Sequence, residues 1–88
     1  GLSAAWPNPV SRSAHAAGRV SLELPSAGPV TLAVYDLLGR ERSSLLSRTL
    51  QAGSYTVDWN PGTLENGVYL IRLAAQGSTR VRKFTVID

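Results

Sequence analysis

Apolar and polar side chains alternate along most of this chain with a period of two residues. The segments with this alternation are 19–24, 29–36, 44–50, 54–60, 67–75 and 79–87. No segment keeps the 3.6-residue spacing of a helix through three turns, and residues typical of turns separate one segment from the next. The pattern therefore predicts an all-β fold, a single antiparallel β-sandwich of about six to seven strands.

The same alternation predicts which side chains face the core. The expected inward rows are Val20, Leu22 and Leu24; Val30, Leu32 and Val34; Tyr55, Val57 and Trp59; Tyr69, Ile71 and Leu73; and Phe84 with Val86. Segment 67–75 is largely apolar on both faces, so we expect a central strand that is covered on both sides. Trp59 is expected to contribute most to the core, because truncating a buried Trp to Ala costs about 3 to 5 kcal/mol.

The first 17 residues differ from the rest. Pro7 and Pro9 remove two backbone donors and favour an extended course. We expect residues 1–17 to form an extended lead-in, with Trp6 against the sandwich edge and a mobile polar loop over residues 11–18. Residues 18–88 then form the sandwich, and the chain as a whole is expected to be part of a longer protein.

The stretch VYDLLGRE, residues 34–41, places two leucines where a turn is usually polar. Asp36 can accept backbone N–H bonds in a tight turn, and Gly39 can supply a positive φ. Turn chemistry does not explain Leu37 and Leu38. Either at least one of them folds back to close the open end of the sandwich, or one stays exposed beside the following arginine as part of a docking surface.

The composition excludes several classes of protein. The chain has 88 residues, enough for one small domain, and no cysteine, so neither a disulfide nor a thiolate metal site can stabilise it. Nine basic residues give a net charge of +3, but they are scattered and not interleaved with aromatic residues, so we do not expect nucleic acid as a partner. No apolar run approaches the roughly 20 residues of a membrane-spanning segment.

Candidate catalytic and metal-binding groups are sparse. His15 is the single histidine, so no histidine-based triad or zinc cluster is expected. Residues 58–67 are rich in oxygen ligands, and Asp58, Asn60 and Glu65 could be read as a calcium loop, but the spacing departs from an EF-hand and favours a turn. We therefore expect no enzyme activity, no cofactor and no metal.

Four blocks in this order carry a family resemblance: WPNP at 6–9, VYDLLGR at 34–40, GVYLIRL at 67–73 and RKFTV at 82–86. Over residues 6–87 the chain resembles the C-terminal sorting domain of the type IX secretion system, which occurs on exported proteins of Bacteroidetes and related phyla. The Ig-like domain of the flagellar hook-cap protein is structurally similar. The tail departs from the pattern, because many members end on lysine or glutamine and here Asp88 follows Ile87.

The resemblance implies an Ig-like β-sandwich that is a non-catalytic sorting signal. Its implied partners are a covalently linked N-terminal cargo, the outer-membrane translocon and a surface sortase-like peptidase that joins the cargo to anionic lipopolysaccharide. The implied route passes through the periplasm and across the outer membrane to the cell surface, so the cargo is secreted or displayed. If the domain is removed by cleavage, the cut is expected before Trp6.

Carried over to this chain, the resemblance places partner recognition in three blocks. The candidates are Tyr35, Asp36, Leu37, Leu38, Gly39, Arg40, Gly67, Val68, Tyr69, Lys83, Phe84, Thr85 and Val86. The last strand can also leave one edge of a sheet open. Basic residues there either discourage nonspecific pairing or allow a selected partner to add a strand, and the sequence leaves both open.

Two other functions remain open from the sequence. An accessory carbohydrate-binding module would present Trp6, Tyr35 or Tyr55 to a polysaccharide. A structural Ig-like module would act only as a spacer in a secreted enzyme. The identity of the cargo cannot be read from these residues.

Overall fold

The computed structural model describes residues 3–5, 10–11, 18–61 and 64–87, and its regular elements are strands. They are β1 (Ser3–Ala5), β2 (Val10–Ser11), β3 (Gly18–Leu24), β4 (Gly28–Asp36), β5 (Glu41–Leu50), β6 (Gly53–Trp59), β7 (Gly67–Ala75) and β8 (Ser78–Ile87). All six predicted strands are present. Their bounds agree with the alternation to within one residue, except that β5 begins three residues early, at Glu41.

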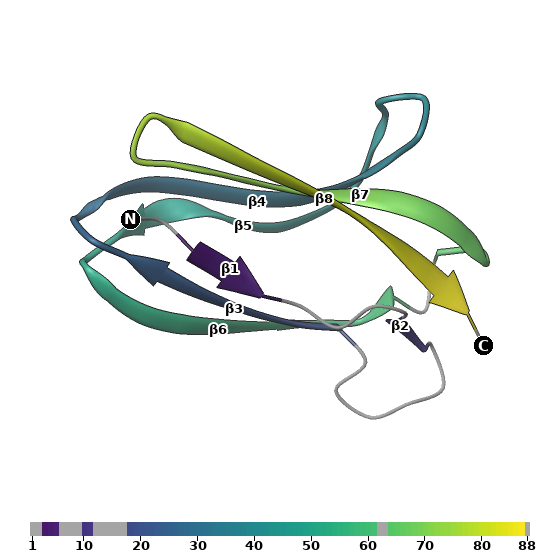
Figure 1. Cartoon of the computed structure of the whole chain (residues 1–88), viewed down its shortest axis with the longest axis horizontal. Coiled ribbons are helices and arrows are strands. Elements are labelled where there is room, and N and C mark those ends of the chain that lie inside the picture. Colours follow the sequence, from purple (N-terminus) through teal and green to yellow (C-terminus); the bar gives the residue numbers. More distant parts are fainter. Residues whose placement is uncertain (1–2, 6–9, 12–17, 62–63, 88) are drawn as a thin grey trace.

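The strands form two facing sheets, so the prediction of an all-β sandwich is confirmed (Figure 1). One sheet has the order β1-β3-β6 and the other the order β2-β8-β7-β4-β5. The long strands pair antiparallel with their neighbours, whereas the two-residue β2 runs parallel to the end of β8. The short strands β1 and β2 lie in the segment that was expected to be lead-in, and the division of the chain at residue 18 stays a prediction.

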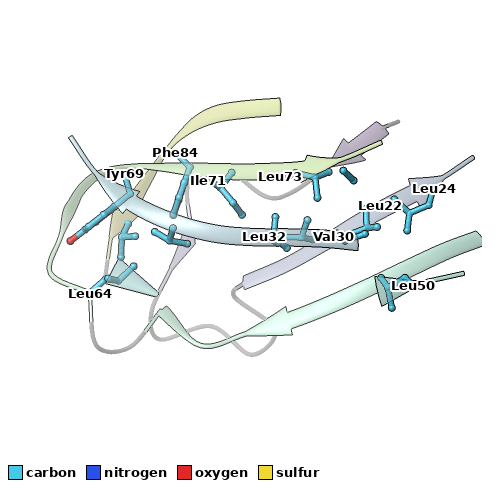
Figure 2. Close-up of a cluster of buried hydrophobic side chains, with 14 residues drawn as sticks. Leu22, Leu24, Val30, Leu32, Leu50, Leu64, Tyr69, Ile71, Leu73 and Phe84 are labelled. Atoms are coloured by element: carbon cyan, nitrogen blue, oxygen red, sulfur yellow. The ribbon is translucent and has the colours of Figure 1, made fainter. Parts of the chain in front are cut away.

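Apolar side chains from both sheets meet between the layers (Figure 2). The inward rows predicted for β3, β4, β7 and β8 are confirmed. The buried apolar cluster is Val20, Leu22, Leu24, Val30, Leu32, Val34, Leu50, Leu64, Tyr69, Ile71, Leu73, Ala75, Phe84 and Val86. Because the rows alternate with exposed positions on β3 and β6, these two strands keep their other face in solvent.

Trp59 does not have the central position that the sequence indicated. It is half-buried and packs against the border of the core, as do Tyr55 and Val57 of the same strand. Phe84 is the largest fully buried side chain instead. The two rings still meet edge to face across the sandwich, with centroids 5.9 Å apart, so Trp59 links β6 to β8.

Strand β7 is central, but the expectation that both of its faces are covered is wrong. It lies between β4 and β8 in the five-stranded sheet. On its outer face Val68 is 37% exposed and Arg72 is also exposed, because no described element packs over that side. Leu70, between them on the same face, is half-buried by its neighbours within the sheet.

Strand β5 is irregular. Its register against β4 shifts twice, between Leu32 and Ala33 and between Val34 and Tyr35. The first shift lets the consecutive Leu45 and Leu46 both pack against the core, which simple alternation does not allow. The second lies beside Arg42, whose guanidinium comes within ion-pair distance of Asp36.

Two expectations for the lead-in fall outside the described residues. They are the position of Trp6 against the sandwich edge and the polar loop expected over residues 11–18, of which 12–17 are not described. Ser11 and Gly18, the ends of the expected loop, are the last residue of β2 and the first residue of β3.

Candidate functional site

Three sequence blocks that are distant in the chain lie side by side at one end of the five-stranded sheet. Asp36 at the end of β4 is opposite Tyr69 on β7, and Tyr69 is opposite Phe84 on β8. The adjacent row across the same strands contains Tyr35, Leu70 and Lys83. The β4–β5 turn extends from this end (Figure 1). The topology therefore gathers the candidate recognition residues into one region.

Asp36 organises the β4–β5 turn. Its Oδ1 accepts hydrogen bonds from the backbone N–H groups of Leu38 and Arg40, at 2.9 and 3.0 Å. Its own N–H donates to the Arg40 carbonyl at 2.9 Å, and its carbonyl accepts from the Gly39 N–H at 3.0 Å. Gly39 has φ +85°, a conformation that favours glycine. The turn is thus closed on itself by local bonds, as the sequence suggested.

The two leucines of the turn point into solvent. Leu37 is 63% exposed and Leu38 is 79% exposed. The interpretation that at least one of them closes the end of the sandwich is therefore wrong. The hydrogen bonds to Asp36 hold the backbone of the turn in this conformation, with both leucine side chains outside the core. A hairpin tip with two adjacent exposed leucines is left, next to the exposed Arg40.

The Asp36 carboxylate forms ion pairs with two arginines at the base of this turn. Asp36 is 8% exposed, and its Oδ2 accepts a hydrogen bond from the Arg40 Nε at 2.8 Å. The Arg42 Nη1 lies 3.7 Å from the same oxygen. The backbone hydrogen bond from Arg40 lowers the pKa of Asp36 below its ordinary value of 3.8, helped by the Arg40 guanidinium and the Leu38 N–H, although burial acts in the opposite direction. The aspartate is therefore ionised at neutral pH.

The structure divides the candidate recognition residues by exposure. Exposed are Leu37, Leu38, Gly39, Arg40, Val68 and Lys83. Half-buried are Tyr35, Gly67 and Thr85. Buried are Asp36, Tyr69, Phe84 and Val86. In the folded domain a partner can touch the first group directly, whereas the last group acts by shaping the surface.

Tyr69 is a structural residue at this end. Its hydroxyl donates to the Glu65 carbonyl at 2.8 Å, and its ring lies 6.0 Å from that of Phe84. A tyrosine that fixes the start of a strand to the preceding loop is a known feature of Ig-like sandwiches. Tyr55 makes the same kind of bond to the Gln51 carbonyl at the start of β6.

Two apolar positions at this end, half-buried Leu70 and exposed Ile87, were not among the recognition residues expected from the sequence. Leu70 lies between Tyr35 and Lys83 on the outer face, and Ile87 is 40% exposed at the end of β8. Strand alternation puts both on the outer face, Leu70 with Val68 and Ile87 with Thr85, so this pattern could have added them to the candidates. We define the end surface as Leu37, Leu38, Arg40, Val68, Leu70, Lys83 and Ile87.

The aromatic platform of the carbohydrate-binding alternative is not assembled from Tyr35 and Tyr55. Tyr35 lies on the outer face of the five-stranded sheet, beside a groove of about 280 Å³ that Glu41 and Arg72 also line. Tyr55 belongs to the other sheet and packs against the core. Trp6 and His15 are outside the described residues.

The expected calcium ligands serve other contacts where they are described. Asp58 pairs with Arg19, whose Nε lies 2.8 Å from its Oδ1. Within the described ranges, no group of three or more His, Cys, Asp or Glu residues could hold a metal ion. Across the same part of the chain, no helix is long and apolar enough to cross a membrane.

The fold and the end surface define a small β-sandwich domain that presents a shaped, partly apolar surface. The family model described as "Secretion system C-terminal sorting domain" matches residues 4–87. The chain therefore belongs to this family, the C-terminal sorting domains of type IX secretion. Such a domain is a sorting signal, which implies a cargo protein, the type IX machinery and export toward the cell surface or the medium. No curated protein matches the chain.

Proposed function

We propose that this domain is a non-catalytic address label that takes a covalently linked N-terminal cargo through the periplasm, across the outer membrane and to the cell surface. The observation that carries the proposal is the family match over residues 4–87. The label works by shape and charge, and it needs no cofactor or metal. A rigid β-sandwich suits this role, because its surface is fixed before the partner arrives.

The proposed partners act at two places. The outer-membrane translocon binds the folded domain, and a surface sortase-like peptidase cuts the lead-in before Trp6. A cut there leaves β1 on the cargo side, although Ser3–Ala5 pairs with β3 in the smaller sheet. Cleavage would therefore also remove the covalent link between β1 and the rest of that sheet.

The end surface is the proposed contact with the translocon. Leu37 and Leu38 lie in a turn that is held by five local hydrogen bonds. The backbone of this turn is therefore already ordered, and little of its conformational entropy is lost when a partner binds the two leucines as anchors. Arg40 and Lys83 are exposed nearby on the same end of the sheet and give a basic rim. An apolar centre with a charged rim is the usual anatomy of a protein interface.

A display experiment tests this function. The chain is fused behind a fluorescent cargo that carries an export signal, in a host with a type IX system. Wild type should give surface fluorescence that added protease removes from intact cells. The double variant Leu37→Ser, Leu38→Ser should fold normally, because both side chains are exposed, and should reduce display by about tenfold or more, as the loss of interface anchors does.

The matched control changes two exposed alanines in turns at the opposite end of the sandwich, Ala27→Ser with Ala52→Ser. It should be displayed like wild type. Cargo that reaches the surface without the domain would overturn the sorting role. Full display of the folded leucine variant would remove the hairpin tip from the recognition surface and leave the sorting role standing.

A further inference from the structure

Among the described residues, strand β8 has a neighbouring strand along only a short part of one edge. On one side it pairs with β7 through nine consecutive residue pairs without a register shift. A two-residue turn fixes that register, because Gln76 and Gly77 both have the positive φ, 58° and 71°, that tight hairpins require. On the other side, the described strand that pairs with β8 is β2, at Val86 and Ile87. Along residues 78–84, no described strand lies on that side.

The same half of β8 is exposed on both faces. Residues 78–83 are all exposed, whereas every second residue of the neighbouring β7 from Tyr69 onward is buried. Val81 is 46% exposed in this segment. A strand that shows an apolar side chain and a regular backbone edge is a template for pairing with another chain.

The charged residues of β8 are all basic. Arg80, Arg82 and Lys83 are exposed, and the strand contains no acidic residue. Arg82 and Lys83 are consecutive, so they project from opposite faces of the sheet. The exposed Arg72 lies opposite Val81 on β7 and adds a further basic group to the outer face. A strand added to this edge would meet positive charge on both of its faces.

Two other edge strands, β5 and β6, differ from β8. The backbone of β5 shifts register twice, which interrupts any continuous ladder with an added strand. Strand β6 is regular but carries no basic residue, and its Asp58 is already paired with Arg19. Of these three edges, β8 combines an unshifted backbone with a run of basic side chains.

We propose that the edge of β8 over residues 78–84 accepts an extended acidic segment of a partner protein as an additional strand. The inference rests on the proposed function, since it gives the export partner a defined chemistry. Seven residues of strand span about 23 Å. The segment carries carboxylates on both faces, toward Arg82 and Lys83, and an apolar residue beside Val81. The pairing with β2 indicates that the far end of this edge already holds a strand.

The test uses the 88-residue chain and a synthetic eight-residue peptide of Glu, Thr and Val. Binding is followed by NMR titration and by hydrogen exchange of backbone amides. The peptide should bind and protect alternate amides of residues 78–84, because every second N–H of an edge strand points outward. The variants Arg82→Glu and Lys83→Glu, each checked for folding by circular dichroism, should weaken binding by about fivefold or more.

Three controls decide between strand addition and simple charge attraction. Arg48→Glu makes the same charge change at an exposed position of β5 and should alter the affinity less than about twofold. The acidic peptide with alternate N-methylated residues should not bind, nor should its lysine counterpart. Equal binding of the N-methylated peptide, or protection of amides outside β8, would overturn the inference.

The peptide experiment and the export experiment can fail independently of each other. If export depends on the domain but the peptide leaves the β8 amides unprotected, only the strand-addition inference fails. If cargo is exported without the domain, the sorting role fails. Protection of the β8 amides by the acidic peptide would then still establish the strand-accepting edge.

Discussion

Asp36 shows how one residue can set both the shape and the pH response of a functional region. Its carboxylate accepts backbone hydrogen bonds from Arg40 and Leu38 and pairs with the Arg40 guanidinium, and these contacts together lower its pKa in the folded state. The folded protein therefore binds fewer protons than the unfolded chain near the ordinary pKa of 3.8. This contribution to stability is fully present above that value and is lost as the pH falls through the lower folded-state pKa.

The variant Asp36→Asn should consequently unfold at a lower temperature than wild type at neutral pH, and the difference should shrink as the pH falls below about 4. Thermal unfolding followed by circular dichroism between about pH 3 and pH 7 measures this. Glu41→Gln is the control, since it removes an exposed carboxylate that borders the turn without touching these bonds. A difference between wild type and Asp36→Asn that stays constant with pH would show that the charge of Asp36 contributes nothing.

At the scale of single residues, the sequence predicted the roles of Asp36 and Gly39 but not the positions of the leucines. Aspartate and glycine have local roles in a turn, so their spacing suffices. Whether Leu37 and Leu38 fold inward depends on how far the turn lies from the apolar core. Tertiary packing sets this distance, so it cannot be predicted from the local sequence.

At the scale of elements, the pairing of β3 with β6 depends on a close approach at Gly18. A Cβ atom at this position would lie 2.6 Å from the Trp59 ring and 2.6 Å from the Trp59 carbonyl oxygen. The backbone oxygen cannot move without disturbing the ladder. Gly18→Ala should therefore destabilise the domain by about 1 to 3 kcal/mol, the usual cost of overpacking, as measured by urea unfolding.

The control for this variant is Gly28→Ala, at the start of β4. A Cβ atom there would lie 3.5 Å from the Gln76 amide nitrogen, an ordinary contact. Its effect should stay within about 0.5 kcal/mol. If both variants unfold at the same urea concentration as wild type, the Trp59 ring does not pack on Gly18 in solution.

Alternation predicted six strands well because a strand that buries one face places apolar residues at every second position. The prediction failed where a strand does not meet this condition. Strands β1 and β2 have three and two residues, too few to show a period, and the bulges of β5 shift Leu45 and Leu46 onto the same side. Apolar residues on both faces of β7 suggested two covering layers, whereas one face borders solvent.

At the scale of the molecule, the candidate site could be predicted only as separate blocks. The order of the blocks is visible in the sequence, but their meeting at one end of the sheet follows from the strand order β8-β7-β4. The blocks also mix two roles that a motif does not separate. Val68 and Lys83 face outward, whereas Tyr69 and Phe84 hold the core together. A motif match therefore marks residues needed for folding along with those that a partner touches.

This mixture predicts the result of removing the last strand. Deletion of residues 79–88 takes Phe84 and Val86 out of the core and leaves β7 without a neighbour on that side. Loss of a buried Phe side chain alone costs about 3 to 5 kcal/mol, against a typical total stability of about 5 to 15 kcal/mol. The truncated chain should therefore lose cooperative thermal unfolding, as measured by circular dichroism.

The consequence concerns how export experiments are interpreted. A truncated cargo that stays in the periplasm would report an unfolded label, and it would not locate the surface that the translocon reads. Folded variants with changes at exposed positions, such as Leu37→Ser with Leu38→Ser or Lys83→Glu, separate the two causes because they leave the core intact. A truncated chain that still melts cooperatively near the wild-type temperature would mean that β8 is a detachable strand, and export failure after truncation would then directly implicate it in recognition.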